Sequence, residues 1–213
     1  MGRPSRNVDI QLLAAGRELY PATGASGLSV RKVAERAGVN LGMFHYHFGN
    51  KDAFVRALLQ SLYEEMFADL QTATAGSIDP VLGLRSALKV IARFARDNRV
   101  LLRRLMADAA AGEAPALDFV RANFPRHFAL VMGLIATGQQ AGRLKPVPLV
   151  QAVTFVAGAV AAPILLGSAI VDAGLAPPPI AEHFASHVLT DAALDERIEL
   201  ALAGLALAPE VPP

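Results

Sequence analysis

Apolar residues recur along the chain at intervals of three and four, the period of an amphipathic helix, and the two-residue alternation of strands is scarce. A first helix is expected from about Ile10 and should stop at Pro21 and Gly24. A second helix is expected after Ser29, a residue type suited to an N-cap. It should end at Gly38, because glycine adopts a positive φ without steric cost.

Two asparagines mark the starts of the next two helices. Asn40 is expected to cap a short third helix closed by Gly49, and Asn50 a long fourth helix over 51–72. Further helices are expected over 79–98, 99–111, 116–141 with a kink at Pro125, 148–171, 180–189 and 191–207. The pattern predicts an all-α fold.

Composition removes several classes of protein. The 213 residues are 53% hydrophobic, whereas disordered chains combine low hydrophobicity with high net charge. The chain has no cysteine, which excludes a disulfide scaffold, a Cys-ligated zinc site and a thiol nucleophile. The opening residues MGRPSRNVDI lack the apolar stretch of a signal peptide, so we expect a cytoplasmic protein.

The charges are distributed unevenly, although the net charge is only +1. Residues 1–60 hold eight basic and four acidic side chains, and the remainder holds 12 basic and 15 acidic ones. A basic head on an acidic body is typical of a module that binds a polyanion. Ordinary scatter in a short segment would give the same numbers, so the charge pattern alone does not decide.

Residues 29–48 carry the most specific pattern. Two short helices joined by a tight turn at Gly38 form a helix-turn-helix, whose second helix can lie in the major groove of DNA. Five apolar side chains are expected to hold the helices together and leave the opposite face free: Val33, Ala34, Val39, Phe44 and Phe48. A plain helical hairpin would show the same periodicity.

The residues of this region also resemble a known family. The runs GLSVRKVAERAGV (27–39) and FHYHFGNKD (44–52) are similar to the DNA-binding domain of TetR-type transcriptional regulators. The resemblance extends over residues 8–60 without a gap. It implies an all-α homodimer with a helix-turn-helix DNA-binding domain over 1–52 and a helical ligand-binding and dimerisation domain over 53–213.

The resemblance also implies which residues meet DNA. Arg31 on the second helix would contact a base or phosphate, and the third helix would face the groove with Leu41, Gly42, Met43 and His45. Tyr46 or His47, with Lys51, would contact phosphates. Arg3 and Arg6 form a basic N-terminal arm. The third helix departs from the family, because Leu41, Met43 and His45 replace residues that are more often polar or tyrosine. Leu41 and Met43 can touch thymine methyl groups but cannot read polar base edges. We therefore expect A·T pairs opposite them.

The same resemblance implies a small-molecule pocket in the larger domain. Aromatic and methionine side chains with two polar anchors are its candidates: Phe67, Phe94, Met106, Phe119, Phe124, Phe128 and Met132, with Arg93 and His127. Such a set predicts an apolar or aromatic effector, although these residue types are also typical of an ordinary core. No Walker, Rossmann or GxSxG sequence occurs, so we expect no enzymatic activity and no cofactor.

The segment 146–171 carries no charged residue. Its length would span a bilayer, but Pro148, Pro163 and several glycine and polar residues favour a buried interface. We expect a homodimer formed through about 148–171 and 180–189, with no membrane partner. His183, His187 and Asp191 lie four residues apart and would share one face of a continuous helix; a polar stripe and a metal site both fit that spacing, and we assign no metal.

Overall fold

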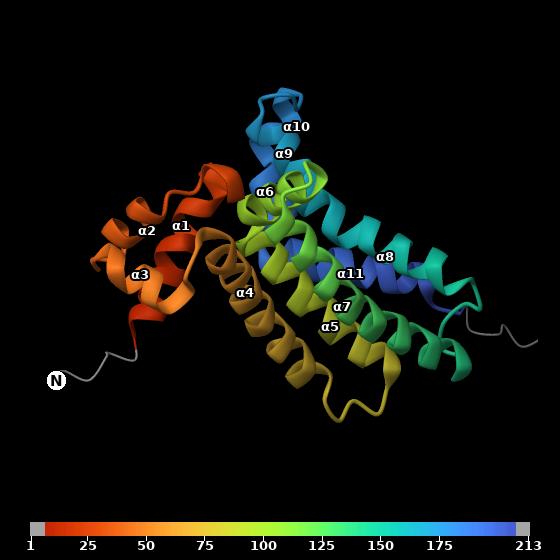
Figure 1. The fold of residues 1–213 in the computed structure, drawn as a ribbon. Coiled ribbons are helices and arrows are strands. Elements are labelled where there is room, and N and C mark those ends of the chain that lie inside the picture. The colour runs from red at the N-terminus through yellow and green to blue at the C-terminus, as the bar shows by residue number, and fades with distance from the viewer. Residues whose placement is uncertain (1–6, 208–213) are drawn as a thin grey trace, which may run out of the picture. The chain divides into compact units, whose positions relative to one another are not determined.

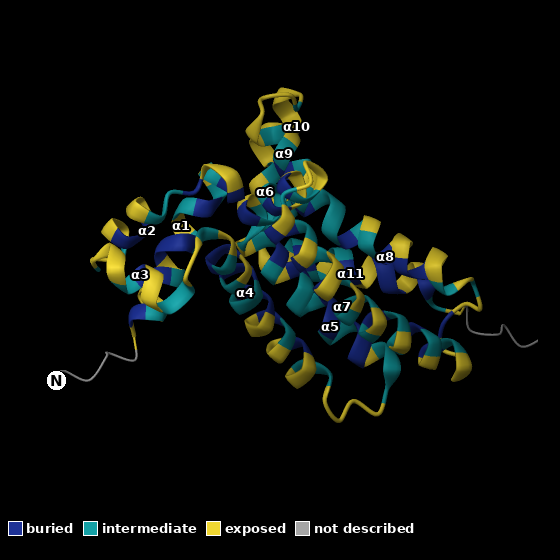
Figure 2. Ribbon diagram, viewed as in Figure 1, coloured by how far each residue is buried: buried dark blue, intermediate teal, exposed yellow. Residues whose placement is uncertain are grey.

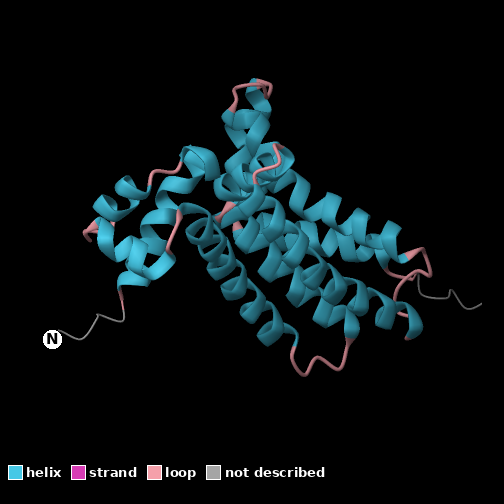
Figure 3. Ribbon diagram, viewed as in Figure 1, coloured by secondary structure: helices cyan, strands magenta, loops and turns pink. Residues whose placement is uncertain are grey.

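The computed structural model describes residues 7–207, which are helical almost throughout and contain no strand (Figures 1 and 3). In chain order the helices are α1 (Val8–Gly27), α2 (Val30–Arg36), α3 (Leu41–Phe48), α4 (Lys51–Thr74), α5 (Pro80–Asp97), α6 (Arg99–Ala110), α7 (Ala114–Gln140), α8 (Leu149–Ala162), α9 (Ser168–Asp172), α10 (Pro178–Phe184) and α11 (Asp191–Leu205). Two π-helical turns, Pro163–Gly167 and Ala185–Leu189, follow α8 and α10. The predicted all-α fold is confirmed.

The chain forms two compact units. Of the described residues, unit 1 comprises 7–65 together with 100–124, and unit 2 comprises 66–99 and 125–207. Helices α4 and α7 therefore each contribute to both units, and α7 changes unit at Pro125. A functional division after residue 52 stays a prediction.

Local signals set the helix ends in unit 1 as expected. The side chain of Ser29 accepts a hydrogen bond from Lys32 N, and that of Asn40 accepts one from Met43 N at 3.0 Å. Asn50 accepts from Ala53 N at 2.9 Å, and Gly38 has a φ of 68°. These caps satisfy amide groups that a helix start otherwise leaves unpaired.

Helix α1 differs from the expectation. It runs through Pro21 to Gly27, and its helical dihedrals break only at Gly24, which has φ 64°. Proline has a fixed φ close to the helical value, so the helix continues through Pro21. The positive φ of Gly24 then turns the chain, and the expected stop at Pro21 was wrong.

A buried carboxylate joins α1 to α6 within unit 1. Asp108 is 2% exposed, and its Oδ2 accepts hydrogen bonds from the Tyr20 hydroxyl at 2.8 Å and from Ala25 N at 2.7 Å. Its Oδ1 accepts from Arg104 Nε at 2.8 Å. Burial, followed by the hydrogen bond to Asp108, raises the pKa of Tyr20 far above its usual range. The phenol therefore stays protonated and remains a hydrogen-bond donor to Asp108.

A row of partly exposed ion pairs joins α5 to α11 within unit 2. Arg85 Nε lies 2.6 Å from Glu199 Oε1, and Lys89 Nζ lies 2.9 Å from Asp195 Oδ2. Arg96 pairs with Asp191 at 2.7 Å. The acidic partners are spaced four residues apart along α11, so each turn presents one carboxylate to α5. Beneath the pairs, aliphatic side chains of both helices are buried, including Leu84, Leu88, Leu194 and Ile198.

The uncharged segment forms α8, a π-helical turn and α9. Leu149–Asp172 could cross a membrane by length and composition alone. One side of it is buried in unit 2, whereas Val150, Phe155, Leu166 and Ile170 are exposed (Figure 2). The segment therefore has an apolar face that the single chain leaves uncovered.

The helix carrying the two C-terminal histidines ends before Asp191. Thr190 has an extended backbone with ψ 155°, and its side chain caps α11 by accepting from Ala193 N. His183 and His187 therefore precede a break, and Asp191 begins the next helix. The break falls between the two helices expected over 180–189 and 191–207, so the condition for one shared face of the three residues is not met.

Candidate nucleic-acid interface

Helices α2 and α3 form a helix-turn-helix packed on α1 and the start of α4 (Figure 1). The Phe44 ring is fully buried and lies 5.0 Å from the ring of Phe54, centroid to centroid. Val33 and Ala34 of α2 are buried beside it. The apolar positions chosen for this role thus hold α3 in place, and its remaining side chains are left at the surface.

The predicted groove positions lie on the open side of α3. Leu41, Gly42 and His45 are exposed, and Met43 is half-buried. The α3 surface offers aliphatic, imidazole and phenol groups and no lysine or arginine. Its capacity for polar base readout is therefore small.

The structure separates the two alternatives for a phosphate contact at the end of α3. Tyr46 is 73% exposed, so its hydroxyl can reach a ligand. The Nε2 atom of His47 is buried and has no hydrogen-bond partner among residues 7–207. His45 Nδ1 lies 2.9 Å from Gly49 O, which holds that ring against the helix end. Tyr46 is the better placed of the two alternatives.

Cations around α3 differ in how they are engaged. Arg31 and Lys32 at the start of α2 are exposed, and neither has an ion-pair partner within the described part of the chain. Arg36 is held by Glu18. Lys51 Nζ donates to Ser26 O at 2.7 Å, so its ammonium group ties α4 to the end of α1 in this structure.

Three further basic residues bear on DNA contact. Arg3 and Arg6 lie outside the described residues. Lys32 was missed, although its exposure and its lack of a partner among residues 7–207 match those of Arg31. In the sequence, the position of Lys32 beside Arg31 at the start of a short helix would have indicated a second DNA contact.

The candidate ligand residues are divided between the units. Met106, Phe119 and Phe124 belong to unit 1, and the others belong to unit 2: Phe67, Arg93, Phe94, His127, Phe128 and Met132. Several are already engaged. The Phe67 ring is covered by the Arg126 guanidinium at 4.2 Å, and Arg93 Nε lies 3.4 Å from Asp191.

A small apolar cavity lies within unit 2, between α5, α7 and α8. Its volume is about 110 Å³, and it is lined by Leu88, Ile91, His127, Phe128, Val131, Val153, Val156, Ala157, Val160 and Ala161. Only His127 and Phe128 of the predicted set line it. The aliphatic residues were missed because buried valine and leucine are indistinguishable in sequence from ordinary core.

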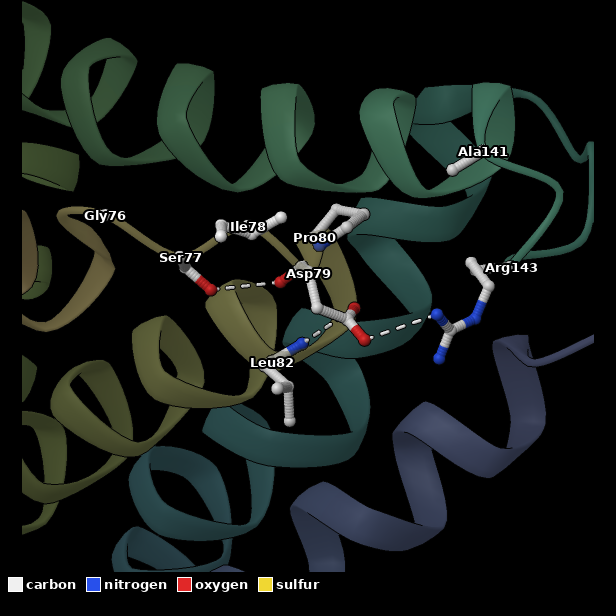
Figure 4. A pocket seen from close by; sticks show the side chains of 8 residues that line it. All are labelled: Gly76, Ser77, Ile78, Asp79, Pro80, Leu82, Ala141 and Arg143. Atoms are coloured by element: carbon white, nitrogen blue, oxygen red, sulfur yellow. Dashed lines mark hydrogen bonds and ion pairs between the residues drawn. The ribbon is translucent and has the colours of Figure 1, made fainter.

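An open hollow lies at the other end of α5, beside the loops 75–79 and 141–143 (Figure 4). Asp79 points into it, caps α5 by accepting from Val81 N at 2.8 Å, and pairs with Arg143 at 3.3 Å. These bonds, chiefly the one from Val81 N, lower the pKa of the Asp79 carboxyl. The acid thus serves helix capping and a loop contact.

The N-terminal residues are similar in sequence to known proteins, and the whole fold is similar to solved structures. Residues 12–58 match the family model of bacterial regulatory proteins, tetR family. The tetracycline repressor protein class A from transposon 1721 of Escherichia coli is 38% identical over 68 residues, covering 32% of this chain and 30% of that protein. The HTH-type transcriptional repressor Rv3405c of Mycobacterium tuberculosis is 30% identical over 121 residues, 53% of this chain and 58% of that protein.

The likeness in fold extends further than the likeness in sequence. The ketosteroid transcriptional regulator KstR2 of Mycobacterium tuberculosis superposes with a TM-score of 0.71 over 97% of this chain and 98% of that one, at 14% identity. The sequence matches, in contrast, span only 30% and 58% of the two relatives named above. What those relatives bind is therefore not transferred by the alignment.

Proposed function

Because the chain is a transcriptional regulator of the TetR family, we propose that it is a dimeric repressor that leaves a near-palindromic operator when a small apolar or aromatic effector binds. It acts in the cytoplasm and is not an enzyme. The observation that carries this proposal is the helix-turn-helix of α2 and α3, with the buried Phe44 fixing α3 and an exposed face left for DNA.

The chemistry of α3 sets the kind of sequence that it reads. Leu41 and Met43 supply apolar contacts that suit thymine methyl groups, and His45 and Tyr46 supply single hydrogen bonds. Arg31 on α2 is free of ion pairs among the described residues and reaches a base or phosphate. We therefore propose A·T pairs opposite Leu41 and Met43 in each half-site.

Dimerisation follows from the uncovered apolar face of unit 2. Val150, Phe155, Leu166 and Ile170 are exposed along Leu149–Asp172, and a second copy of the same face would remove them from water. Two heads must then present their α3 helices roughly 34–36 Å apart to enter successive major grooves. The proposed dimer uses about 148–171 and 180–189 of each copy.

The effector site would lie within the larger domain. The cavity between α5, α7 and α8 is apolar with one imidazole, which supports an apolar or aromatic effector. Its 110 Å³ is below the roughly 300–1,000 Å³ of typical ligand sites, so binding requires the lining helices to part. If the movement disfavours the DNA-binding conformation, the effector lowers the affinity for DNA. DNA then lowers the affinity for the effector by the same factor, with a coupling free energy of typically about 1–3 kcal/mol.

The first experiment selects bound sequences from a random duplex pool with the purified chain. An inverted repeat with A·T pairs at the groove-facing positions is expected. A repeat with G·C at all of them would refute the proposed role of Leu41 and Met43. Absence of any selected motif, together with salt-independent binding, would contradict sequence-specific regulation.

The selected duplex then tests the cations through the salt dependence of binding. Loss of one phosphate contact lowers the slope of log K against log salt by about 0.9. We expect Lys51→Ala to lower it by about one unit if the ammonium exchanges Ser26 O for phosphate. Arg36→Ala is the matched control, because Glu18 already holds Arg36. A slope unchanged by Lys51→Ala would confine Lys51 to its contact with α1.

A further inference from the structure

Two histidines form a pair on an exposed segment of unit 2 that comprises α10 and the π-helical turn Ala185–Leu189, here called the hairpin. His183 of α10 and His187 of the π-helical turn that follows are four residues apart, and their ring centroids are 5.6 Å apart. Both side chains are exposed. Imidazoles at this separation on one helical face can bind a single metal ion together.

The hydrogen bonds around His187 fix which of its nitrogens is free. Its Nδ1 lies 3.1 Å from His183 O and 2.9 Å from the Ser186 hydroxyl, so both polar partners of the ring lie at Nδ1. The Ser186 hydroxyl also lies 2.9 Å from the same carbonyl, so the serine, the carbonyl and Nδ1 form one cluster. Nε2 is engaged by no residue among 7–207, and in the tautomer that donates from Nδ1 to the His183 carbonyl its lone pair is available to a metal. A backbone carbonyl bound to the other ring nitrogen is the usual support of a metal-ligating histidine.

One chain does not complete such a site. Among the described residues no group of three or more His, Cys, Asp or Glu side chains could hold a metal ion. Asp191, the acid four residues after His187, is engaged by Arg96 at 2.7 Å and Arg93 at 3.4 Å. Tetrahedral zinc normally takes four ligands, so two must come from elsewhere.

The hairpin itself indicates the source of the other ligands. No residue of α10 or of the following turn is buried, and Ile180 is 55% and Leu175 75% exposed (Figure 2). Ile180 precedes His183 by three residues and His187 by seven, so this apolar side chain lies on the histidine face. A second copy related by a two-fold axis would cover Ile180 and bring an identical histidine pair to the same place.

We propose that His183 and His187 bind one borderline divalent metal ion, of the zinc and cobalt class, together with the same pair of a second copy. This inference rests on the dimer of the proposed function. Four neutral imidazoles give the nitrogen donor set that such ions accept, and the metal links the two hairpins. Metal binding thereby strengthens the dimer.

The test titrates the full chain with zinc by calorimetry and with cobalt by visible absorption. One metal per two chains is expected, with the intense absorption of tetrahedral cobalt. His183→Ala and His187→Ala should each weaken binding by more than about a hundredfold, beyond the upper range for losing a supporting partner. His45→Ala is the matched control for metal uptake, because His45 is exposed and its Nδ1 also contacts a carbonyl, but no imidazole lies four residues away.

Three results would overturn the site. Uptake of no metal, or of one octahedral metal per chain, refutes a shared four-imidazole centre. So does equal loss of binding in His45→Ala. The mass of the protein in solution separates this failure from that of the proposed function: a metal-free dimer that binds its operator refutes the metal site alone, whereas a chain that stays monomeric with zinc refutes the dimer as well.

Discussion

Unit 1 and unit 2 use charged side chains in opposite ways. In unit 1 a single carboxylate, Asp108, is buried and accepts hydrogen bonds from Tyr20, Ala25 and Arg104. In unit 2 the carboxylates of α11 stay near the surface and pair with basic residues of α5; the Glu199 side chain, for example, is 51% exposed.

The difference lies in what is left behind when a partner is removed. An exposed ion pair contributes about 0–1 kcal/mol, because water replaces either partner. Removal of a buried acceptor leaves several donors unpaired, each at a cost of about 1–3 kcal/mol. The join between α1 and α6 should therefore depend on one residue, whereas the join between α5 and α11 should tolerate the loss of any one.

The largest effect is expected for Asp108→Ala. Two buried donors, the Tyr20 hydroxyl and Ala25 N, would lose their acceptor, and Arg104 would lose its ion pair. We expect the free energy of unfolding to fall by about 3–5 kcal/mol. Urea denaturation measures it, with Asp118→Ala as control, because Asp118 forms an exposed pair with Arg56 in the same unit. Similar losses for both variants would remove the contrast between buried and exposed acids.

The next effect concerns the glycine that turns the chain beside this carboxylate. A Cβ on Gly24 would lie 2.1 Å from an Arg104 nitrogen, and its φ of 64° disfavours any L side chain. Gly24→Ala must displace a guanidinium group held by Asp108, so we expect a loss of about 2–3 kcal/mol. Gly76→Ala is the matched control.

Gly76 has the same kind of backbone without the close contact. Its φ is 72°, and nothing lies within 4 Å of an added Cβ. Its substitution should therefore cost only the conformational strain, about 1 kcal/mol. Thermal or urea unfolding of the two variants separates strain from crowding, and equal losses would show that Arg104 moves freely.

The head was predictable because its rules are local. Ser29, Asn40 and Asn50 cap helices that begin one residue later, and Gly38 turns the chain where a positive φ is needed. Each of these signals acts over three or four residues, so spacing alone locates it. The exposed face of α3 then follows from the burial of Phe44.

The interior of the chain was less predictable because its partners are distant in sequence. Asp108 bonds to Tyr20, 88 residues away, and nothing near Asp108 distinguishes it from a surface acid. The apolar cavity is lined by aliphatic residues from α5, α7 and α8 that look like any core. Arg93 was expected to face a ligand, yet it lies beside Asp191 of α11.

A smaller effect tests the exposed pairs themselves. Glu199→Gln removes the negative charge that pairs with Arg85 and leaves a side chain of the same size. We expect the free energy of unfolding to fall by about 0.2–1 kcal/mol at low salt. The loss should nearly vanish at about 1 M salt, where the Debye length is about 3 Å. Urea denaturation at the two salt concentrations checks this, and a loss that ignores salt would point to packing by the glutamate stem.

The smallest effect at neutral pH is expected for Asp79→Asn, and its value lies in how it changes with pH. The folded-state pKa of Asp79 is lowered, chiefly by the bond from Val81 N and also by Arg143. Its charge therefore stabilises the fold above the unfolded pKa of about 3.9, and this contribution is lost as pH falls through the lower folded pKa. Asparagine also caps helices, so the variant isolates the charge from the cap. Wild type should be the more stable at pH 7, and the difference measured by urea denaturation should close once the pH falls below the lowered folded-state pKa. A difference that persists in acid would mean that Asp79 stabilises α5 through the shape and hydrogen bonds of its side chain and not through its charge.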